Sequence, residues 1–209
     1  MVWNQRGMEV EDVVMSANVV LSQWYGAKDK SFDHFLGMIN KEDGDEQWVL
    51  PTVNKIKVNT NAAIFEASGC YSFAFVVRNH EGKLVEARSR CCSGNISPEI
   101  AEAMGIREAL SWTKEQDRTG VVVETDCLVA VQAIRGPSIL LSYFGITIED
   151  CGVLLEEVRG KEVSVKFIKR SANNVAHSIA RYSSSIADRI WTMDNVHPEF
   201  INVMLNDLK

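Results

Sequence analysis

Residues 55–65 read KIKVNTNAAIF, and within this stretch the apolar side chains begin to alternate with polar ones. One face of an extended chain would carry Ile56, Val58, Thr60, Ala62 and Ile64. The other face would carry Lys57, Asn59, Asn61 and Ala63. Because successive side chains point to opposite faces of a strand, this period of two predicts the first strand of a β-sheet.

The stretches that follow predict the rest of an α/β fold. YSFAFVVR (71–78) and KLVEARSR (83–90) flank a four-residue turn and predict an antiparallel hairpin. Helical patterns then cover about 98–115, 127–135, 142–158 and 172–186, and strand patterns cover 121–125 and 163–169. Three antiparallel strands followed by parallel crossovers predict a five-stranded mixed sheet flanked by helices.

The chain before and after this pattern divides naturally into segments. Residues 10–24 carry apolar side chains at helical spacing, and KEDGDEQ (41–47) is a charged, Gly-containing break. We expect an N-terminal helical segment with an acidic linker over residues 1–47. The α/β domain should cover 48–186, and a C-terminal tail 187–209.

Composition and charge narrow the class of protein. The 46% hydrophobic and 24% charged residues are typical of a soluble globular protein. The apolar runs are shorter than the roughly 18–20 residues of a membrane span, and the N-terminus lacks the pattern of a secretory signal. The five cysteines show no CxxC spacing, so we expect free thiols. We therefore expect an intracellular protein of the nucleus or cytoplasm, with no membrane partner.

The charge distribution bears on nucleic-acid binding. The formal net charge is −6, and residues 1–50 hold 4 Lys and Arg against 9 Asp and Glu. Local basic clusters are restricted to Arg78, Arg88 and Arg90 and to Lys166, Lys169 and Arg170. Nucleic-acid binders usually carry a basic patch, so tight, non-specific binding is not expected of this chain.

Two acidic residues stand where open α/β sheets place their sites. Asp126 follows the buried strand 121–125, at the carboxyl end where ligands of such sheets bind. It could equally cap the helix at 127–135, unless Thr125 does so. Glu102 lies on the apolar stripe of its helix. It needs a partner or a metal if it is buried, and neither if it reaches solvent.

Asn59 and Asn61 are the unusual residues of the first strand, because Asn is depleted in strands. They could hydrogen-bond across the end of the sheet, or they could be the remnant of a ligand shell. Glu124, two residues before Asp126 on the same face, is a minor candidate for a further acid.

Five stretches taken together resemble the reverse-transcriptase-like RNase H domain family, which is abundant in plants and related to non-LTR retroelements. In order they are QWVLP…KIKVNTNAA, FAFVVRNHEGKLV, AEAMGIREAL, VVVETDCLVAVQAI and VKFIKRSANNVAHSIAR. The resemblance spans about residues 48–186, and it implies the ribonuclease H-like fold. In active members, acidic residues hold two magnesium (or manganese) ions, and the enzyme cleaves the RNA strand of an RNA–DNA hybrid.

Transferred residue by residue, the resemblance places the family's four acids on Asn61, Glu102, Asp126 and His177. Glu102 and Asp126 remain as metal ligands, whereas Asn61 and His177 are degenerate positions. The resemblance further implies that Arg78, Lys169, Arg170 and Asn173 contact nucleic acid.

The two replacements lower the expected activity. Asn61 lacks a charge, and an imidazole suits zinc or copper better than magnesium. We therefore expect a weak or inactive hydrolase, a pseudoenzyme of retrotransposon origin. Magnesium binding is doubtful in this copy, and so is a strong interaction with RNA–DNA hybrid. The alternatives are a non-catalytic nucleic-acid-binding module and a protein-interaction module. A basic groove beside Asp126 would favour the former, and scattered charges the latter.

Overall fold

The computed structural model describes residues 34–39, 41–136, 142–183 and 188–208. The helix expected over residues 10–24 lies outside this part of the chain. Within it, the strands are β1 (Ile56–Phe65), β2 (Cys70–Arg78), β3 (Leu84–Ser93), β4 (Val121–Thr125), β5 (Val163–Phe167) and β6 (Arg189–Trp191). The helices are α2 (Pro98–Glu115), α3 (Leu128–Arg135), α4 (Tyr143–Glu157), α5 (Asn174–Tyr182) and α6 (Pro198–Asn206), with short 3₁₀ turns at Glu66–Ser68 and Arg170–Ala172.

The six described strands form one mixed sheet in the order β5-β4-β1-β2-β3-β6. β1 is antiparallel to β2, with Asn61 opposite Ala74, and parallel to β4, with Thr60 opposite Thr125. The α/β class and the hairpin are confirmed. The sheet has one strand more than the five predicted, because the three-residue β6 is too short to show an alternating pattern.

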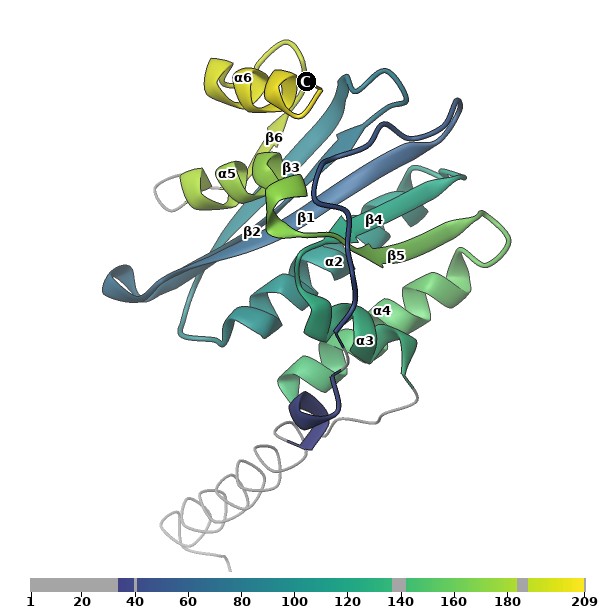
Figure 1. The fold of residues 1–209 in the computed structure, drawn as a ribbon. Helices are drawn as coiled ribbons and strands as arrows, with labels where there is room; N and C mark the ends of the chain where they lie inside the picture. Colours follow the sequence, from purple (N-terminus) through teal and green to yellow (C-terminus); the bar gives the residue numbers. More distant parts are fainter. Residues whose placement is uncertain (1–33, 40, 137–141, 184–187, 209) are drawn as a thin grey trace, which may run out of the picture.

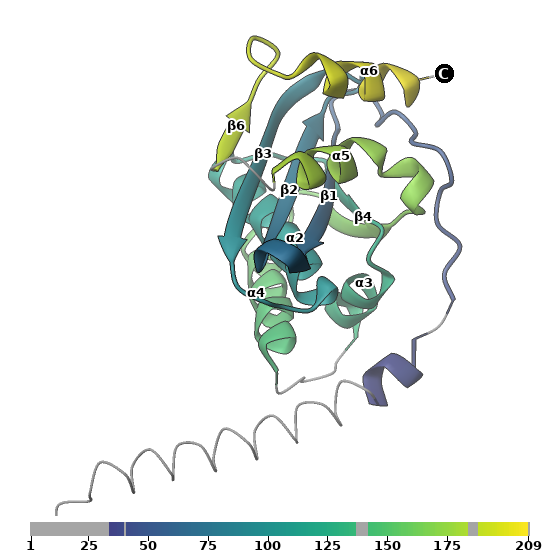
Figure 2. The ribbon, with the colours of Figure 1, turned by 90° about the vertical axis from the view of Figure 1, so that its left-hand side faces the viewer.

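Helices cover both faces of the sheet (Figures 1 and 2). α2, α3 and α4 pack on one face, around a core that includes Val58, Phe73 and Ile106. α5 and α6 pack on the other face, where Ala74, Ile179 and Phe200 belong to a second core. Residues 187–209, expected as a tail, therefore supply both a strand and a helix that covers the sheet.

Most predicted helices keep their bounds. α2 begins at Pro98, as its N-terminal pattern indicates, although the Ser97 side chain makes no capping hydrogen bond. α5 begins two residues later than the helix predicted at 172–186, because residues 170–172 form a separate 3₁₀ turn, and residues 184–186 lie outside the described part of the chain. All five cysteines are free, as expected. No helix in the described part of the chain is both long and apolar enough to cross a bilayer.

Candidate functional site

The candidate site lies where β1, β4 and α5 meet. Asn61 Nδ2 donates to Asp126 Oδ1 at 2.6 Å, and Asn173 Nδ2 donates to the same oxygen at 2.7 Å. His177 Nδ1 lies 3.0 Å from Asn61 Oδ1. Arg170 Nη2 lies against the imidazole, 3.2 Å from Nε2 and 3.3 Å from Nδ1. Side chains from three separate elements thus form one continuous hydrogen-bonded chain.

The donors and acceptors in this chain can be assigned from its chemistry. The carboxylate of Asp126 only accepts, so the amide nitrogen of Asn61 must face it, and Oδ1 must face His177. His177 Nδ1 therefore carries the proton and donates. Arg170 Nη2 lies at nearly the same distance from both ring nitrogens, 3.2 Å from Nε2 and 3.3 Å from Nδ1, so the guanidinium contacts the imidazole without a single directed hydrogen bond. The links from His177 to Asn61 and from Asn61 to Asp126 each have one donor and one acceptor.

The surroundings of His177 favour the neutral form of its imidazole. Burial lowers the pKa of the imidazole, and the positive charges of Arg170 and Arg181 lower it further, against an opposing effect of Asp126. A proton on Nδ1 is what the hydrogen bond to Asn61 Oδ1 requires, and a neutral ring tolerates the adjacent guanidinium of Arg170.

Asp126 is positioned by amides, not by the start of α3. The N-cap residue of that helix is Cys127, whose N–H donates to Thr125 Oγ1 at 3.2 Å. Asn173 Nδ2 also donates to the Thr60 carbonyl at 2.8 Å, which ties β1 to the start of α5. The interpretation of Asp126 as the helix cap is therefore wrong. Asn173, expected to contact nucleic acid, is 1% exposed and instead holds the carboxylate.

Glu102 reaches the site from α2. Burial raises the pKa of its carboxyl well above the usual range, the negative charge of Asp126 raises it further, and a hydrogen bond from the Ala62 backbone opposes the rise. Its Oε2 atom is buried and has no hydrogen-bond partner within the described residues. Glu102 as a whole is half-buried, so one carboxyl oxygen is enclosed while the residue keeps some contact with solvent.

This donor set fits a hydrogen-bonded cluster better than a pair of magnesium ions. Magnesium prefers charged oxygen ligands in an octahedral arrangement, and imidazole is a poor substitute. Asp126 Oδ1 already accepts two N–H groups, Asn61 Oδ1 faces a donor, and the surroundings of Glu102 favour its protonated form. Within the described residues, no three His, Cys, Asp or Glu side chains are grouped to hold a metal.

Arg78 belongs to a second, structural network. Its side chain is 1% exposed, donates to Asp207 Oδ2 at 2.8 Å and to Asn59 Oδ1 at 2.9 Å, and stacks 3.4 Å above the ring of Trp48. The prediction that Arg78 contacts nucleic acid is therefore wrong, because its guanidinium is inaccessible. The sequence did not reveal this network, since its members are 19 to 129 residues apart.

Glu124 and Asn59 are also committed to this network. Asn59 Nδ2 donates to Glu124 Oε2 at 3.0 Å, and Lys57 Nζ lies 2.6 Å from Glu124 Oε1. The two asparagines of β1 thus have separate roles: Asn61 serves the candidate site, and Asn59 links Arg78 to Glu124. Because its charge is neutralised by Lys57, Glu124 is not available as a third acid.

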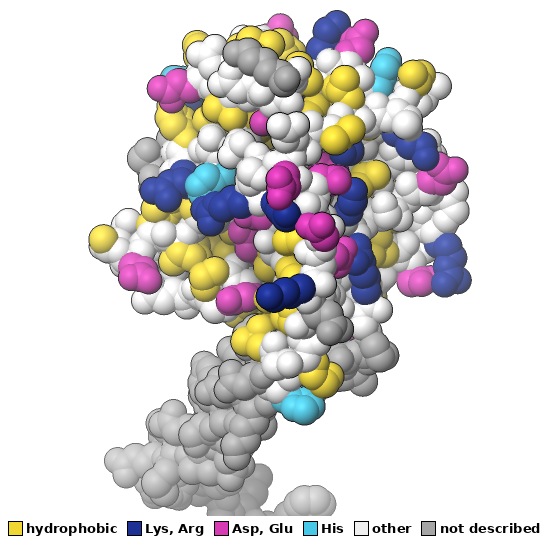
Figure 3. Space-filling model, viewed as in Figure 1, with side chains coloured by type: hydrophobic (Ala, Val, Ile, Leu, Met, Phe, Trp, Pro, Cys, Tyr) yellow, Lys and Arg dark blue, Asp and Glu magenta, His cyan; other side chains and the backbone are white. Residues whose placement is uncertain are grey.

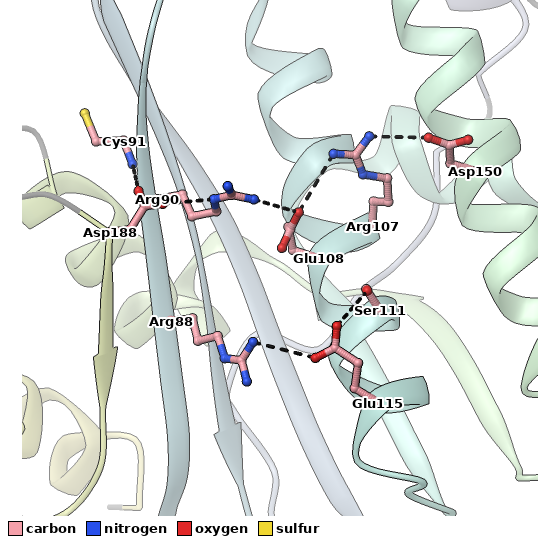
Figure 4. Close-up of polar contacts among 9 residues, drawn as sticks. All are labelled: Arg88, Arg90, Cys91, Arg107, Glu108, Ser111, Glu115, Asp150 and Asp188. Carbon is pink, nitrogen blue, oxygen red and sulfur yellow. Dashed lines mark hydrogen bonds and ion pairs between the residues drawn. The ribbon is translucent and has the colours of Figure 1, made fainter.

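The arginines of β3 lie away from Asp126, on the face covered by α2. Arg90 contacts Glu108 and Asp188 at 3.3 and 3.2 Å, and Arg88 lies 3.9 Å from Glu115 (Figure 4). No single basic groove therefore joins Arg78, Arg88, Lys169 and Arg170. Lys169 and Arg170 remain beside the site, with Lys169 at the surface and Arg170 on His177.

Comparison with known proteins agrees with this fold. A family model described as reverse transcriptase-like matches residues 59–183, more than half of the chain. No curated protein sequence matches significantly.

Among solved structures, RNase H1 from the archaeon Halobacterium salinarum NRC-1 is similar, with a TM-score of 0.55 and 14% identity. That similarity covers 62% of this chain and 96% of the archaeal one. The N-terminal RNase H domain of a Mycobacterium tuberculosis protein is similar with a TM-score of 0.55 and 14% identity, and the similarity covers 62% of this chain and 93% of that one. An RNase H1 isolated from compost, solved in complex with RNA/DNA hybrid, has a TM-score of 0.53 and 17% identity. That similarity covers 61% of this chain and 95% of the compost enzyme. The chain belongs to the reverse transcriptase-like family and has the RNase H-like fold.

Proposed function

We propose that this chain is an RNase H-like domain that binds nucleic acid of the RNA–DNA hybrid type and hydrolyses it weakly or not at all. The observation that carries the proposal is the series of hydrogen bonds from His177 through Asn61 to Asp126, with Arg170 against the imidazole. In this series of hydrogen bonds, the side chains of Asn61 and His177 take the places that the family's pattern assigns to acids. We propose that it replaces, rather than supports, a resident pair of magnesium or manganese ions.

Charge explains why these substitutions matter. An ion pair at about 4 Å is worth on the order of 4 kcal/mol at an effective dielectric of 20, and a divalent ion doubles that figure. The losses at Asn61 and His177 therefore remove a large part of the attraction for a metal. The positive charge of Arg170, next to His177, further opposes a cation there.

Nucleic-acid binding is supported by the fold and by Lys169 and Arg170, which lie beside the site. The compost RNase H1 and a foamy viral protease–reverse transcriptase were both solved in complex with RNA/DNA hybrid. We carry this partner class to the present chain as a proposal. A net charge of −6 predicts that its binding is weak at physiological salt.

A labelled RNA–DNA hybrid, assayed for cleavage and for binding, tests the proposal. The expected result is weak binding at low salt, with no cleavage above that of an Asp126→Asn control in 10 mM Mg²⁺ or Mn²⁺. Robust metal-dependent cleavage that the control lacks would overturn it.

A protein-interaction module is the second candidate. The observation in its favour is the dispersal of the arginines, with Arg78 buried against Trp48 and Arg88 on the α2 face. Absence of any hybrid binding at low salt would favour this candidate.

A further inference from the structure

The acidic segment at residues 42–46, here named the acidic strap, is more than a linker. It passes the carboxyl end of β5 before the chain enters β1 (Figure 1). Asp45 pairs with Ile168 in an isolated parallel bridge, and its carbonyl accepts from Lys169 N at 2.9 Å. Ser171 Oγ donates to the Glu46 carbonyl at 2.6 Å. One backbone hydrogen bond and one from the Ser171 hydroxyl thus fix the strap beside the residues that follow β5.

Every acidic side chain of the strap contacts a basic one of the domain. Glu42 accepts two hydrogen bonds from Arg135 at 2.9 and 3.0 Å. Asp45 lies 2.6 Å from Lys166. Lys169 lies 3.1 Å from Asp43 and 2.6 Å from Glu46. Acidic and basic side chains alternate over this face of the molecule (Figure 3).

The basic partners lie near one another, on β5 and beside it. Arg135 donates to the carbonyl of Val165 on β5, and Lys166 and Lys169 lie on and just after that strand. Arg170 follows directly and contacts His177 of the candidate site. Four cations therefore run along β5 to the site, and the strap neutralises Arg135, Lys166 and Lys169.

The ion pairs are of a kind that another polyanion can replace. The side chains of Arg135, Lys166 and Lys169 are 48%, 46% and 38% exposed. Exposed pairs contribute about 0–1 kcal/mol each and are screened by salt. Carboxylates at this spacing offer the same hydrogen-bonding chemistry to Lys and Arg as phosphates do.

We propose that Arg135, Lys166, Lys169 and Arg170 form a binding surface for the phosphate backbone of an RNA–DNA hybrid, and that the acidic strap occupies this surface in the free protein. The inference rests on the proposed function. It adds where on the protein the hybrid binds and which segment controls that binding. It also explains how a chain without a visible basic patch could still bind nucleic acid. The patch is present, but an acidic segment of the same chain covers it.

Gly44 allows a test that leaves the charge unchanged. A Cβ atom there would lie 2.8 Å from Phe167 Cδ1 and 3.0 Å from Ile168 Cα, too close for the present packing. The phenyl ring could move, but the backbone of Ile168 could not move without disturbing β5. Gly44→Val should therefore push the strap off the surface at constant net charge.

The experiment measures binding of a fluorescent hybrid by anisotropy at 50 and 150 mM salt. One variant neutralises the strap (Glu42→Gln, Asp43→Asn, Asp45→Asn, Glu46→Gln). Its control makes the same charge change at exposed acids elsewhere (Glu66→Gln, Glu149→Gln, Glu156→Gln, Asp194→Asn). Three released cations should steepen the salt dependence by about 2–3 in log K per log salt, with about tenfold or greater tightening at 50 mM.

The possible outcomes test the proposed binding surface and the proposed function separately. Tighter binding by the strap variant than by its control, and by Gly44→Val than by the parent, supports the inference. Adding Lys166→Glu and Lys169→Glu should then abolish the gain. Equal affinity of parent, strap variant and control would overturn the inference alone. Metal-dependent cleavage would overturn the proposed function and leave the surface standing, and absence of binding by every variant would overturn both.

Discussion

His177 and Asn61 face each other across the junction of α5 and β1, with Nδ1 of the ring 3.0 Å from Oδ1 of the amide. The two residues stand where the resemblance places two acids, and they are complementary to each other. The imidazole donates, the amide oxygen accepts, and the amide nitrogen passes the connection on to Asp126. His177, which replaces one acid, thus supplies the N–H donor for the amide oxygen of Asn61, which replaces the other.

Restoring both acids should make stability depend on magnesium. In the double variant Asn61→Asp, His177→Asp, four carboxyl groups meet, so their repulsion should lower the melting temperature of the metal-free protein. Magnesium at ten times its Kd should return about 1.4 kcal/mol. Thermal unfolding with and without 10 mM Mg²⁺ checks this, and the parent should show no such shift. A folded double variant whose melting temperature does not change with magnesium would show that the surrounding groups no longer accept a metal.

Removing the amide of Asn61 should destabilise the fold. Asn61→Ala leaves the His177 N–H without its acceptor and takes one of two donors from Asp126, so we expect a loss of about 1–3 kcal/mol. Asn202→Ala, at an exposed position of α6, is the matched control and should cost less than about 0.5 kcal/mol. Urea unfolding measures both. Equal effects of the two changes would contradict the proposed importance of the hydrogen-bonded chain.

Glu102→Gln should stabilise the protein at neutral pH. The pKa of Glu102 is raised in the folded state, so the folded protein binds this proton more tightly than the unfolded chain does. The stability that comes from this group is complete below about pH 4.5 and declines as pH rises toward the folded-state pKa. The Gln variant lacks this decline. The urea midpoints of the parent and the variant should coincide near pH 4 and separate toward pH 7, with that of the variant higher. Midpoints that differ by the same amount at every pH would contradict the raised pKa of Glu102.

Breaking the pair between Arg78 and Asp207 should loosen the C-terminal helix. The side chains are 1% and 5% exposed, so Asp207→Ala leaves a buried guanidinium without its carboxylate and should cost about 3 kcal/mol. The exposed Asp194→Ala serves as the control, expected within about 0.5 kcal/mol. Hydrogen exchange should show faster exchange in α6. Unchanged protection of this helix would mean that apolar packing of Phe200 and Met204 alone holds it.

Local patterns were sufficient for most of the fold. The alternation in residues 55–65 and the Ser-Pro-Glu start of α2 predicted those elements, because strand and helix periodicity follow from backbone geometry. The two surviving acids were found in the same way, from a strand end and an apolar helix stripe. β6 was missed because three residues cannot display a period.

By itself, then, the sequence determined the fold class and singled out Glu102 and Asp126, since these depend on residue type and spacing along the chain, and its resemblance to the family added the positions of Asn61 and His177. The tertiary structure alone decided what each charged group does. Arg78 and Arg88 look alike in the sequence, yet one is buried on Trp48 and the other faces α2. The acidic strap resembled a solvated linker until its partners on β5 were known. Charge pairing depends on distances in space between residues as many as 129 positions apart, and no periodicity along the chain encodes them.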